Sequence, residues 1–137
     1  MTDQEQSRDL IKGKAFHRFR ISAVAILMIL FGLAEIVTGF THNFFGVSTT
    51  RSAFSAYANA GVGALYAVAG VLILSMKKRY VAIALGCLTL DVVGRIALVV
   101  TGFFPINTFR QTGAMVAGTT IVIIFAAYIG SKWKQFS

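Results

Sequence analysis

Charged residues, cysteine and proline are all scarce in this sequence of 137 residues. Only 13% of its residues are charged and 56% are hydrophobic, whereas a soluble domain has about 25% charged and about 45–50% apolar residues. The composition therefore excludes an ordinary soluble domain. It also excludes a disordered chain, which requires low hydrophobicity. The length is sufficient for one domain.

The residues that metal, cofactor and catalytic sites need are also scarce. Cys87 is the only cysteine, which excludes a disulfide within the chain and a cysteine-based zinc cluster. His17 and His42 have no second histidine, cysteine or acid at ligand spacing, and no apolar run contains a histidine that could ligate a haem. No nucleophile–base pair and no glycine-rich phosphate loop is visible. We therefore predict no metal, no cofactor and no catalytic residue, and expect a protein that is not an enzyme.

Four long apolar runs account for the high hydrophobicity. A helix that crosses the roughly 30 Å hydrocarbon core of a bilayer needs about 20 mostly apolar residues. Such runs occupy residues 21–40, 56–75, 81–104 and 113–130, and the segments between them are polar or basic. Pro105, the only proline, follows the third run, where it helps to end a helix. The sequence thus predicts an all-α fold, an up-down bundle of four transmembrane helices.

The basic residues are distributed unequally between the two sides of the predicted membrane domain. Cytoplasmic loops carry an excess of lysine and arginine. The side of the two termini has ten such residues: Arg8, Lys12, Lys14, Arg18, Arg20, Lys77, Lys78, Arg79, Lys132 and Lys134. The opposite side has only Arg51 and Arg110. We therefore expect a multi-pass protein of the cytoplasmic membrane with both termini in the cytoplasm, facing anionic lipid. No folded basic domain remains to bind nucleic acid.

Residues 1–20 form a basic segment ahead of the first span, and residues 131–137 form a short tail after the last. Ile11, Ala15 and Phe19 recur every four residues, so a helix would carry them on one face. Two interpretations stay open. The segment is either an amphipathic helix that lies on anionic lipid before the chain turns into the membrane, or a solvated tail whose charges only set the topology.

A short motif recurs near the ends of the first and third spans, where residues 36–40 read IVTGF and residues 99–103 read VVTGF. The second and fourth spans are followed by similar basic segments that end in an aromatic residue expected at the membrane interface, Tyr80 or Phe136. These similarities suggest a helical hairpin duplicated in tandem. The alternative is a chance coincidence of residue types that are common in apolar segments.

Each span also has a stripe of small or polar residues at helical spacing, as is typical where membrane helices pack against one another. The stripes include Gly32 and Glu35 in the first span, Gly63 and Tyr66 in the second, and Gly118 in the fourth. Close helix packing alone accounts for the glycines in these stripes.

Three charged residues, Glu35, Asp91 and Arg95, lie inside the predicted spans. A charge at the bilayer centre costs at least about 2.5–3.5 kcal/mol unless it is paired or hydrated. At about 1.5 Å per residue, Glu35 and Arg95 both lie about 21 Å from the cytoplasmic ends of their spans, and Asp91 lies about 15 Å. Asn59 falls in the layer of Glu35, and Tyr66 falls near the depth of Asp91. We therefore predict a ligand or ion site built from these five residues.

Arg95 is expected to bridge the two carboxylates. Asp91 precedes it by four residues on the same helix, and the guanidinium offers five donors in a fork that can also reach Glu35. Such a cluster has a net charge of −1. A retained proton, a cation, a water or a ligand amine must therefore complete it.

Two functions follow from this cluster. In the first, Arg95 only holds the first and third spans together, and the protein is a structural or accessory subunit. In the second, Glu35 and Asp91 face a polar cavity, and the protein is a proton- or cation-coupled carrier of small molecules or binds a lipophilic ligand. A homo-oligomer or another membrane partner fits either function. A channel would require an oligomer, since four helices leave little room for a pore.

The plan of four short helices with a glutamate in the first is similar to that of small multidrug exporters. The third and fourth spans carry no motif of that family, and the Asp91–Arg95 pair departs from a single isolated glutamate. No activity is inferred from this likeness.

Overall fold

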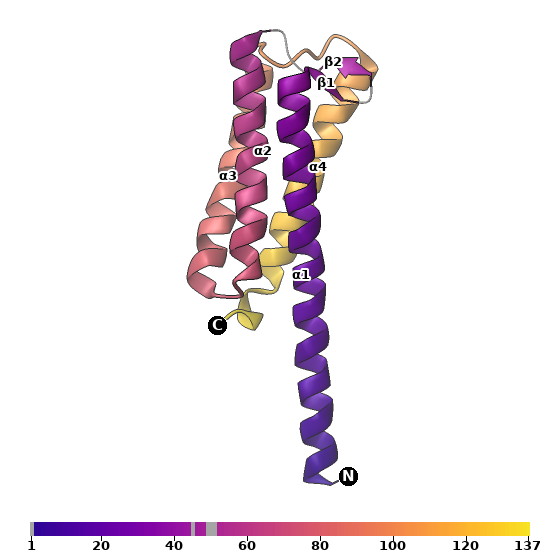
Figure 1. Cartoon of the computed structure of the whole chain (residues 1–137), viewed down its shortest axis with the longest axis vertical. Coiled ribbons are helices and arrows are strands. Elements are labelled where there is room, and N and C mark those ends of the chain that lie inside the picture. The colour runs from indigo at the N-terminus through magenta and orange to yellow at the C-terminus, as the bar shows by residue number, and fades with distance from the viewer. Residues whose placement is uncertain (1, 45, 49–51) are drawn as a thin grey trace.

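The computed structural model describes residues 2–44, 46–48 and 52–137. Four long helices run side by side and alternate in direction (Figure 1). They are α1 (Asp3–Thr41), α2 (Ala53–Leu74), α3 (Lys78–Val100) and α4 (Phe109–Ser131). Each is long and apolar enough to cross a membrane. The predicted all-α fold with four candidate membrane spans is therefore confirmed.

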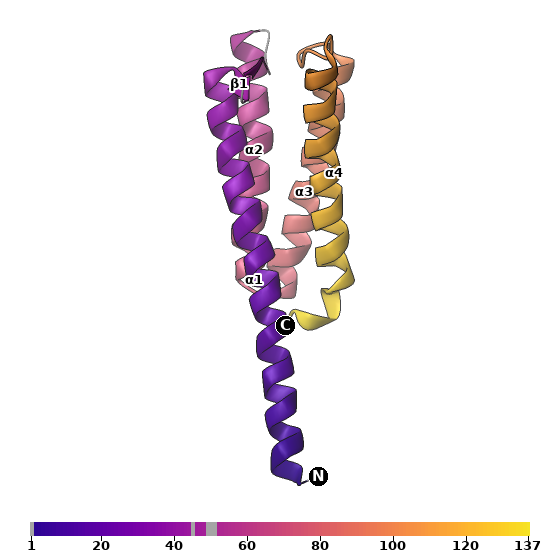
Figure 2. The ribbon, with the colours of Figure 1, turned by 90° about the vertical axis from the view of Figure 1, so that its right-hand side faces the viewer.

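The first helix is much longer than the predicted span. α1 has 39 residues, which correspond to about 58 Å at 1.5 Å per residue. Its basic part projects beyond the other three helices as a straight continuation (Figures 1 and 2). The segment is helical in the structure, and its contact with anionic lipid stays a prediction. The expected change of direction before the span is wrong, because residues 3–41 contain neither a proline nor a positive φ that would interrupt the helix.

Polar residues fix the beginnings of α2 and α4. Thr108 Oγ1 accepts a hydrogen bond from the backbone N–H of Gln111 at 3.2 Å, and Gln111 Oε1 accepts one from the N–H of Thr108 at 3.2 Å. Ser52 and Ser55 form the same reciprocal arrangement at the start of α2. These capping boxes satisfy N–H groups that have no partner within the helix. Both helices consequently begin before the apolar runs from which they were predicted, which start at residues 56 and 113.

The third helix ends at Val100, before the predicted end of its span. The backbone of Gly102 has a φ of +74°, in the left-handed region that ends helices. In α1 the corresponding residue of the repeated motif, Gly39, stays inside the helix. The two copies of the motif thus differ in structure, and the tandem duplication remains a prediction.

The helices form two layers, with α1 beside α2 and α3 beside α4 (Figure 2). Glycines allow α1 and α2 to approach closely. A Cβ on Gly32 would lie 2.5 Å from the backbone nitrogen of Ala67, and a Cβ on Gly70 would lie 2.7 Å from the carbonyl oxygen of Ala25. α4 is the least buried helix and makes few contacts with α1. The bundle is therefore tight on the α1–α2 side and looser around α4.

The larger buried cluster lies at the end of the bundle from which α1 projects, and includes Ile21, Val81 and Ile129. Phe136, expected at the membrane interface, is only 3% exposed and belongs to this cluster. The 3-10 helix η1 (Trp133–Gln135) turns the chain so that this ring can enter the core. Phe136 therefore packs against the protein core, and its depth relative to the membrane interface stays a prediction.

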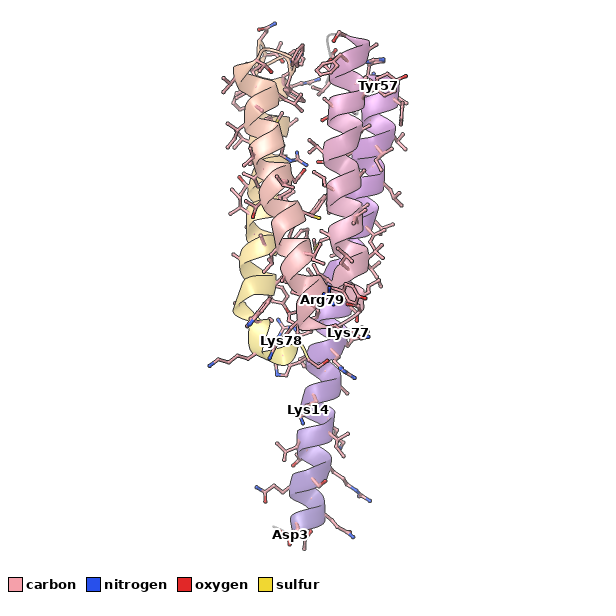
Figure 3. The ribbon with its side chains drawn as sticks, turned by 90° about the vertical axis from the view of Figure 1, so that its left-hand side faces the viewer. Asp3, Lys14, Tyr57, Lys77, Lys78 and Arg79 are labelled. Carbon is pink, nitrogen blue, oxygen red and sulfur yellow. The ribbon has the colours of Figure 1, made fainter. Side chains whose placement is uncertain are left out.

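The basic residues gather at one end of the bundle. Lys14, Lys77, Lys78 and Arg79 lie at the end from which α1 projects, and Tyr57 lies at the opposite end (Figure 3). Arg51, one of the two arginines predicted for that opposite end, is outside the described residues. This arrangement agrees with the unequal distribution of basic residues from which the membrane orientation was predicted.

The connection between α1 and α2 contains a small hairpin that the sequence analysis did not predict. Strand β1 (Asn43–Phe44) pairs antiparallel with β2 (Val47–Ser48). The side-chain amide of Gln111 on α4 donates a hydrogen bond to the carbonyl oxygen of Ser48 at 3.2 Å. Strands of two residues are too short to show an alternating pattern in a sequence.

Candidate functional site

Arg95 on α3 connects two carboxylates from two helices. Its Nε donates a hydrogen bond to Asp91 Oδ2 at 3.2 Å on the same helix. Its Nη2 donates a second hydrogen bond to Glu35 Oε1 on α1. The structure thus brings together the three charged side chains that the depth argument placed in neighbouring layers.

Two glycines on the other helices make room for this cluster. A Cβ on Gly63 of α2 would lie 2.7 Å from the Cβ of Glu35, and a Cβ on Gly118 of α4 would lie 3.0 Å from Nη1 of Arg95. Sequence reasoning treated both only as members of packing stripes. The available signal was depth, because Gly118 lies about 18 Å above Gly130 at 1.5 Å per residue, in the layer of Glu35 and Arg95.

The three charged side chains differ in burial. Asp91 is fully buried and Arg95 is 6% exposed, whereas the side chain of Glu35 is 23% exposed. With both carboxylates ionised, the cluster has a net charge of −1. Glu35 is therefore the charged group that a molecule entering between the helices would meet first.

Three buried polar atoms have no hydrogen-bond partner within the part of the chain that the structure describes. They are Glu35 Oε2, Asp91 Oδ1 and the hydroxyl of Tyr66. Arg95 uses one oxygen of each carboxylate and leaves the other unpaired. Leaving a buried polar group unsatisfied costs about 1–3 kcal/mol, and more when the group is charged. Such atoms mark a place where a proton or a donor from another molecule is favourable.

A cavity of about 250 Å³ lies between α1 and α4 and reaches this cluster. Its polar lining comes from Glu35, Thr38, Asn59, Tyr66 and Arg95. Most of the remaining lining is apolar: Phe31, Ala34, Phe104, Ala114, Met115, Ala117, Gly118 and Ile121. The cavity is thus an apolar space between helices with a charged and polar wall.

Four of the five predicted site residues line this cavity, and the fifth does not. Glu35, Asn59, Tyr66 and Arg95 are in the lining, whereas Asp91 is absent from it. Arg95 lines the cavity and donates one hydrogen bond to each of the two acids. The expectation that both carboxylates face this cavity is therefore met by Glu35 alone, and Asp91 is the buried partner of Arg95 on the same helix.

A second cavity, of about 340 Å³, lies between α3 and α4. Arg95 lines it together with Thr119, Thr120 and mostly apolar side chains. The Thr119 hydroxyl donates to the carbonyl oxygen of Met115 at 2.8 Å and so bonds within its own helix. This second cavity meets Arg95 without a carboxylate in its lining. It therefore lacks the two unpaired acceptors, Glu35 Oε2 and the Tyr66 hydroxyl oxygen, that distinguish the α1–α4 cavity.

Among the described residues, no group of three histidine, cysteine, aspartate or glutamate side chains could hold a metal ion. Comparisons with protein-family models, with curated proteins and with solved structures found no match. The chemistry of the site is therefore the basis on which a function is inferred.

Proposed function

We propose that this chain is a multi-pass membrane protein that binds a small lipophilic amine, in its protonated form, in the cavity between α1 and α4. The observation that carries the proposal is the pairing of an apolar cavity with two buried polar groups on its wall, the Glu35 carboxylate and the Tyr66 hydroxyl. The proposed function requires no catalytic step, metal or cofactor.

The charge of the cluster favours a cation. Arg95 neutralises one of the two carboxylates, so one positive charge completes the site. A protonated amine supplies that charge together with N–H donors, which Glu35 Oε2 and the Tyr66 hydroxyl oxygen can accept. Buried charges in proteins are normally paired and hydrogen-bonded, which the bound amine would achieve for Glu35.

The size and lining of the cavity favour a small ligand with an apolar body. Ligand pockets commonly measure about 300–1,000 Å³ and are mostly apolar, with a few polar groups that fix orientation. The volume of about 250 Å³ lies just below this range. Phe31, Phe104 and Ile121 would contact the apolar part while Glu35 holds the nitrogen.

A carrier function would build on the same site. An ammonium group that displaces a proton from the carboxylate cluster would couple binding to proton release. Proton- or cation-coupled movement of an amine needs this exchange and access from both sides of the membrane. We propose binding as the basic activity and transport as its extension, with both termini in the cytoplasm and anionic lipid around the basic end.

The second candidate is a structural or accessory subunit, alone, as a homo-oligomer or with a membrane partner. One observation favours it: Arg95 joins α1 to α3 through ion pairs with Glu35 and Asp91. Removing one member of a buried ion pair typically costs about 3–5 kcal/mol. The two candidate functions differ in whether the protein binds an amine and whether that binding depends on the charge of Glu35.

Calorimetric titration of the full chain in neutral detergent tests the proposal. The probes are 2-phenylethylamine, which is protonated near neutral pH, and its uncharged analogue 2-phenylethanol. We expect saturable binding of the amine and none of the alcohol, and we expect Glu35→Gln to abolish amine binding. Glu5→Gln, which removes an exposed carboxylate far from the cavity, serves as the matched control. Equal behaviour of the amine and the alcohol would support the structural candidate instead.

A further inference from the structure

A third cavity, with a different chemistry, lies at the basic end of the molecule, between the projecting part of α1 and η1. It measures about 720 Å³. Its lining residues are all exposed: Ile11, Lys14, Ala15, His17, Arg18, Lys134 and Gln135. Lys14, Arg18 and Lys134 give this basic cleft three positive charges, and none of the residues that line it is acidic. Its charge is opposite to that of the amine site.

Two elements carry these cations. Lys14 and Arg18 are four residues apart on α1 and therefore share one helix face. Lys134 belongs to η1, which is tied down on its C-terminal side. Phe136 is buried in the core, and the backbone N–H of Lys78 donates to the carbonyl oxygen of Ser137 at 2.7 Å. These contacts anchor the backbone that carries Lys134 beside the projecting part of α1.

The three cations have no acidic partner in the described part of the chain. Both salt bridges found there belong to Arg95. Other cations at this end lie over aromatic rings, as Arg20 does over Phe16. The basic cleft thus concentrates three uncompensated charges in one concave space, which favours an anionic ligand.

The basic cleft lies at the depth of lipid headgroups in the proposed membrane arrangement. The apolar part of α1 begins at Ile21, and at 1.5 Å per residue Arg18 lies about 4.5 Å and Lys14 about 10 Å beyond it. The headgroup layer adds roughly 5–8 Å on each side of the hydrocarbon core. The cations therefore bracket the level at which phosphate groups sit.

We propose that the basic cleft binds the phosphate group of an anionic phospholipid. Clusters of lysine and arginine beside membrane helices typically recognise such headgroups. Three charges fit best a lipid whose phosphate carries more than one negative charge. This inference is independent of the amine site.

Trp133 gives a direct readout, because it is the only tryptophan and adjoins Lys134 at the start of η1. The full chain in neutral detergent is titrated with phosphatidic acid and, separately, with phosphatidylcholine, while tryptophan emission is recorded. We expect a saturable change with phosphatidic acid only. Lys14→Gln and Arg18→Gln are each expected to weaken it about fivefold, the factor that corresponds to about 1 kcal/mol per basic residue.

Lys12→Gln is the matched control, since it removes one charge from the same segment of α1 but does not line the basic cleft. We expect little change from it, and Lys14→Arg should retain binding. An equal loss with Lys12→Gln, or equal binding of phosphatidylcholine, would overturn the proposal. If free glycerol 3-phosphate competes at the same concentration, the ligand of the basic cleft is a soluble phosphate compound and not the lipid, which would also overturn the proposal. Unchanged melting temperatures verify that the variants are folded.

Discussion

Arg95 on α3 and Glu35 on α1 form an ion pair across the bundle, although 60 residues separate them in the sequence. The same guanidinium also pairs with Asp91, so each carboxylate keeps one oxygen that Arg95 does not use. This arrangement makes Arg95 necessary for the bundle and leaves Glu35 available to a ligand.

Replacement of Arg95 should damage the fold more than replacement of Glu35. Arg95→Gln leaves two carboxylates without their counter-charge, and we expect a loss of about 3–5 kcal/mol in the free energy of unfolding. Glu35→Gln leaves the Arg95–Asp91 pair intact and a neutral cluster, so its loss should be smaller. Denaturant unfolding of both variants in detergent measures the difference. Equal losses would show that Arg95 has no special structural role.

A side chain at Gly63 should be harmful, and one at Gly61 should not. A Cβ on Gly63 would lie 2.7 Å from Glu35 Cβ and 2.9 Å from the carbonyl oxygen of Gly32, whereas at Gly61 nothing lies within 4 Å. Gly63→Ala should therefore destabilise the bundle by about 1–3 kcal/mol through overpacking. Gly61→Ala should be neutral or stabilising by up to about 1 kcal/mol, because alanine favours helix. Unfolding of the two variants side by side provides the test, and similar stabilities would contradict the tight α1–α2 contact.

Filling the α1–α4 cavity should abolish amine binding without changing any charge. Ala114 of α4 lines this cavity, and Ala127 of the same helix is exposed and does not. We expect Ala114→Leu to weaken 2-phenylethylamine binding at least tenfold, and Ala127→Leu to leave it unchanged. Calorimetric titration measures both. Unimpaired binding in Ala114→Leu would place the ligand elsewhere.

The C-terminal segment should contribute to stability through one aromatic ring. Phe136 is 3% exposed and Trp133 is 39% exposed. Phe136→Ala should cost roughly 3–5 kcal/mol, as is typical of a buried aromatic residue. Trp133→Ala should cost much less. Thermal unfolding followed by circular dichroism distinguishes them, and a small effect of Phe136→Ala would mean that the tail does not pack into the core.

Structural features that depend on continuous runs of residues, or on spacing within one helix, were predictable from the sequence. The four helices follow from apolar runs, and the equal depth of Glu35 and Arg95 places both side chains in one layer of the bundle. Asp91 and Arg95 are four residues apart, so their contact needs only a helix. These predictions depend on the rise per residue and on composition, which do not require knowledge of how the helices pack.

Features that depend on packing between helices were not predictable in the same way. The sequence does not reveal that Gly118 faces Arg95. The helical spacing of glycines is the same whether a glycine allows two helices to approach or makes space for a side chain. Asp91 was assigned to a cavity that only Glu35 reaches, because depth gives the layer of a residue but not its rotation about the bundle. Phe136 resembled an interfacial aromatic, since only the turn of η1 directs it inward.

The position of a bound amine tests the account most directly. A crystal structure of the full chain with 2-(4-bromophenyl)ethylamine would locate the bromine by its anomalous scattering. The account predicts the bromine among Phe31, Phe104 and Ile121, with the nitrogen at hydrogen-bond distance, about 2.7–3.2 Å, from Glu35 Oε2 and the Tyr66 hydroxyl. A ligand in the α3–α4 cavity, or one whose nitrogen points away from Glu35, would contradict it.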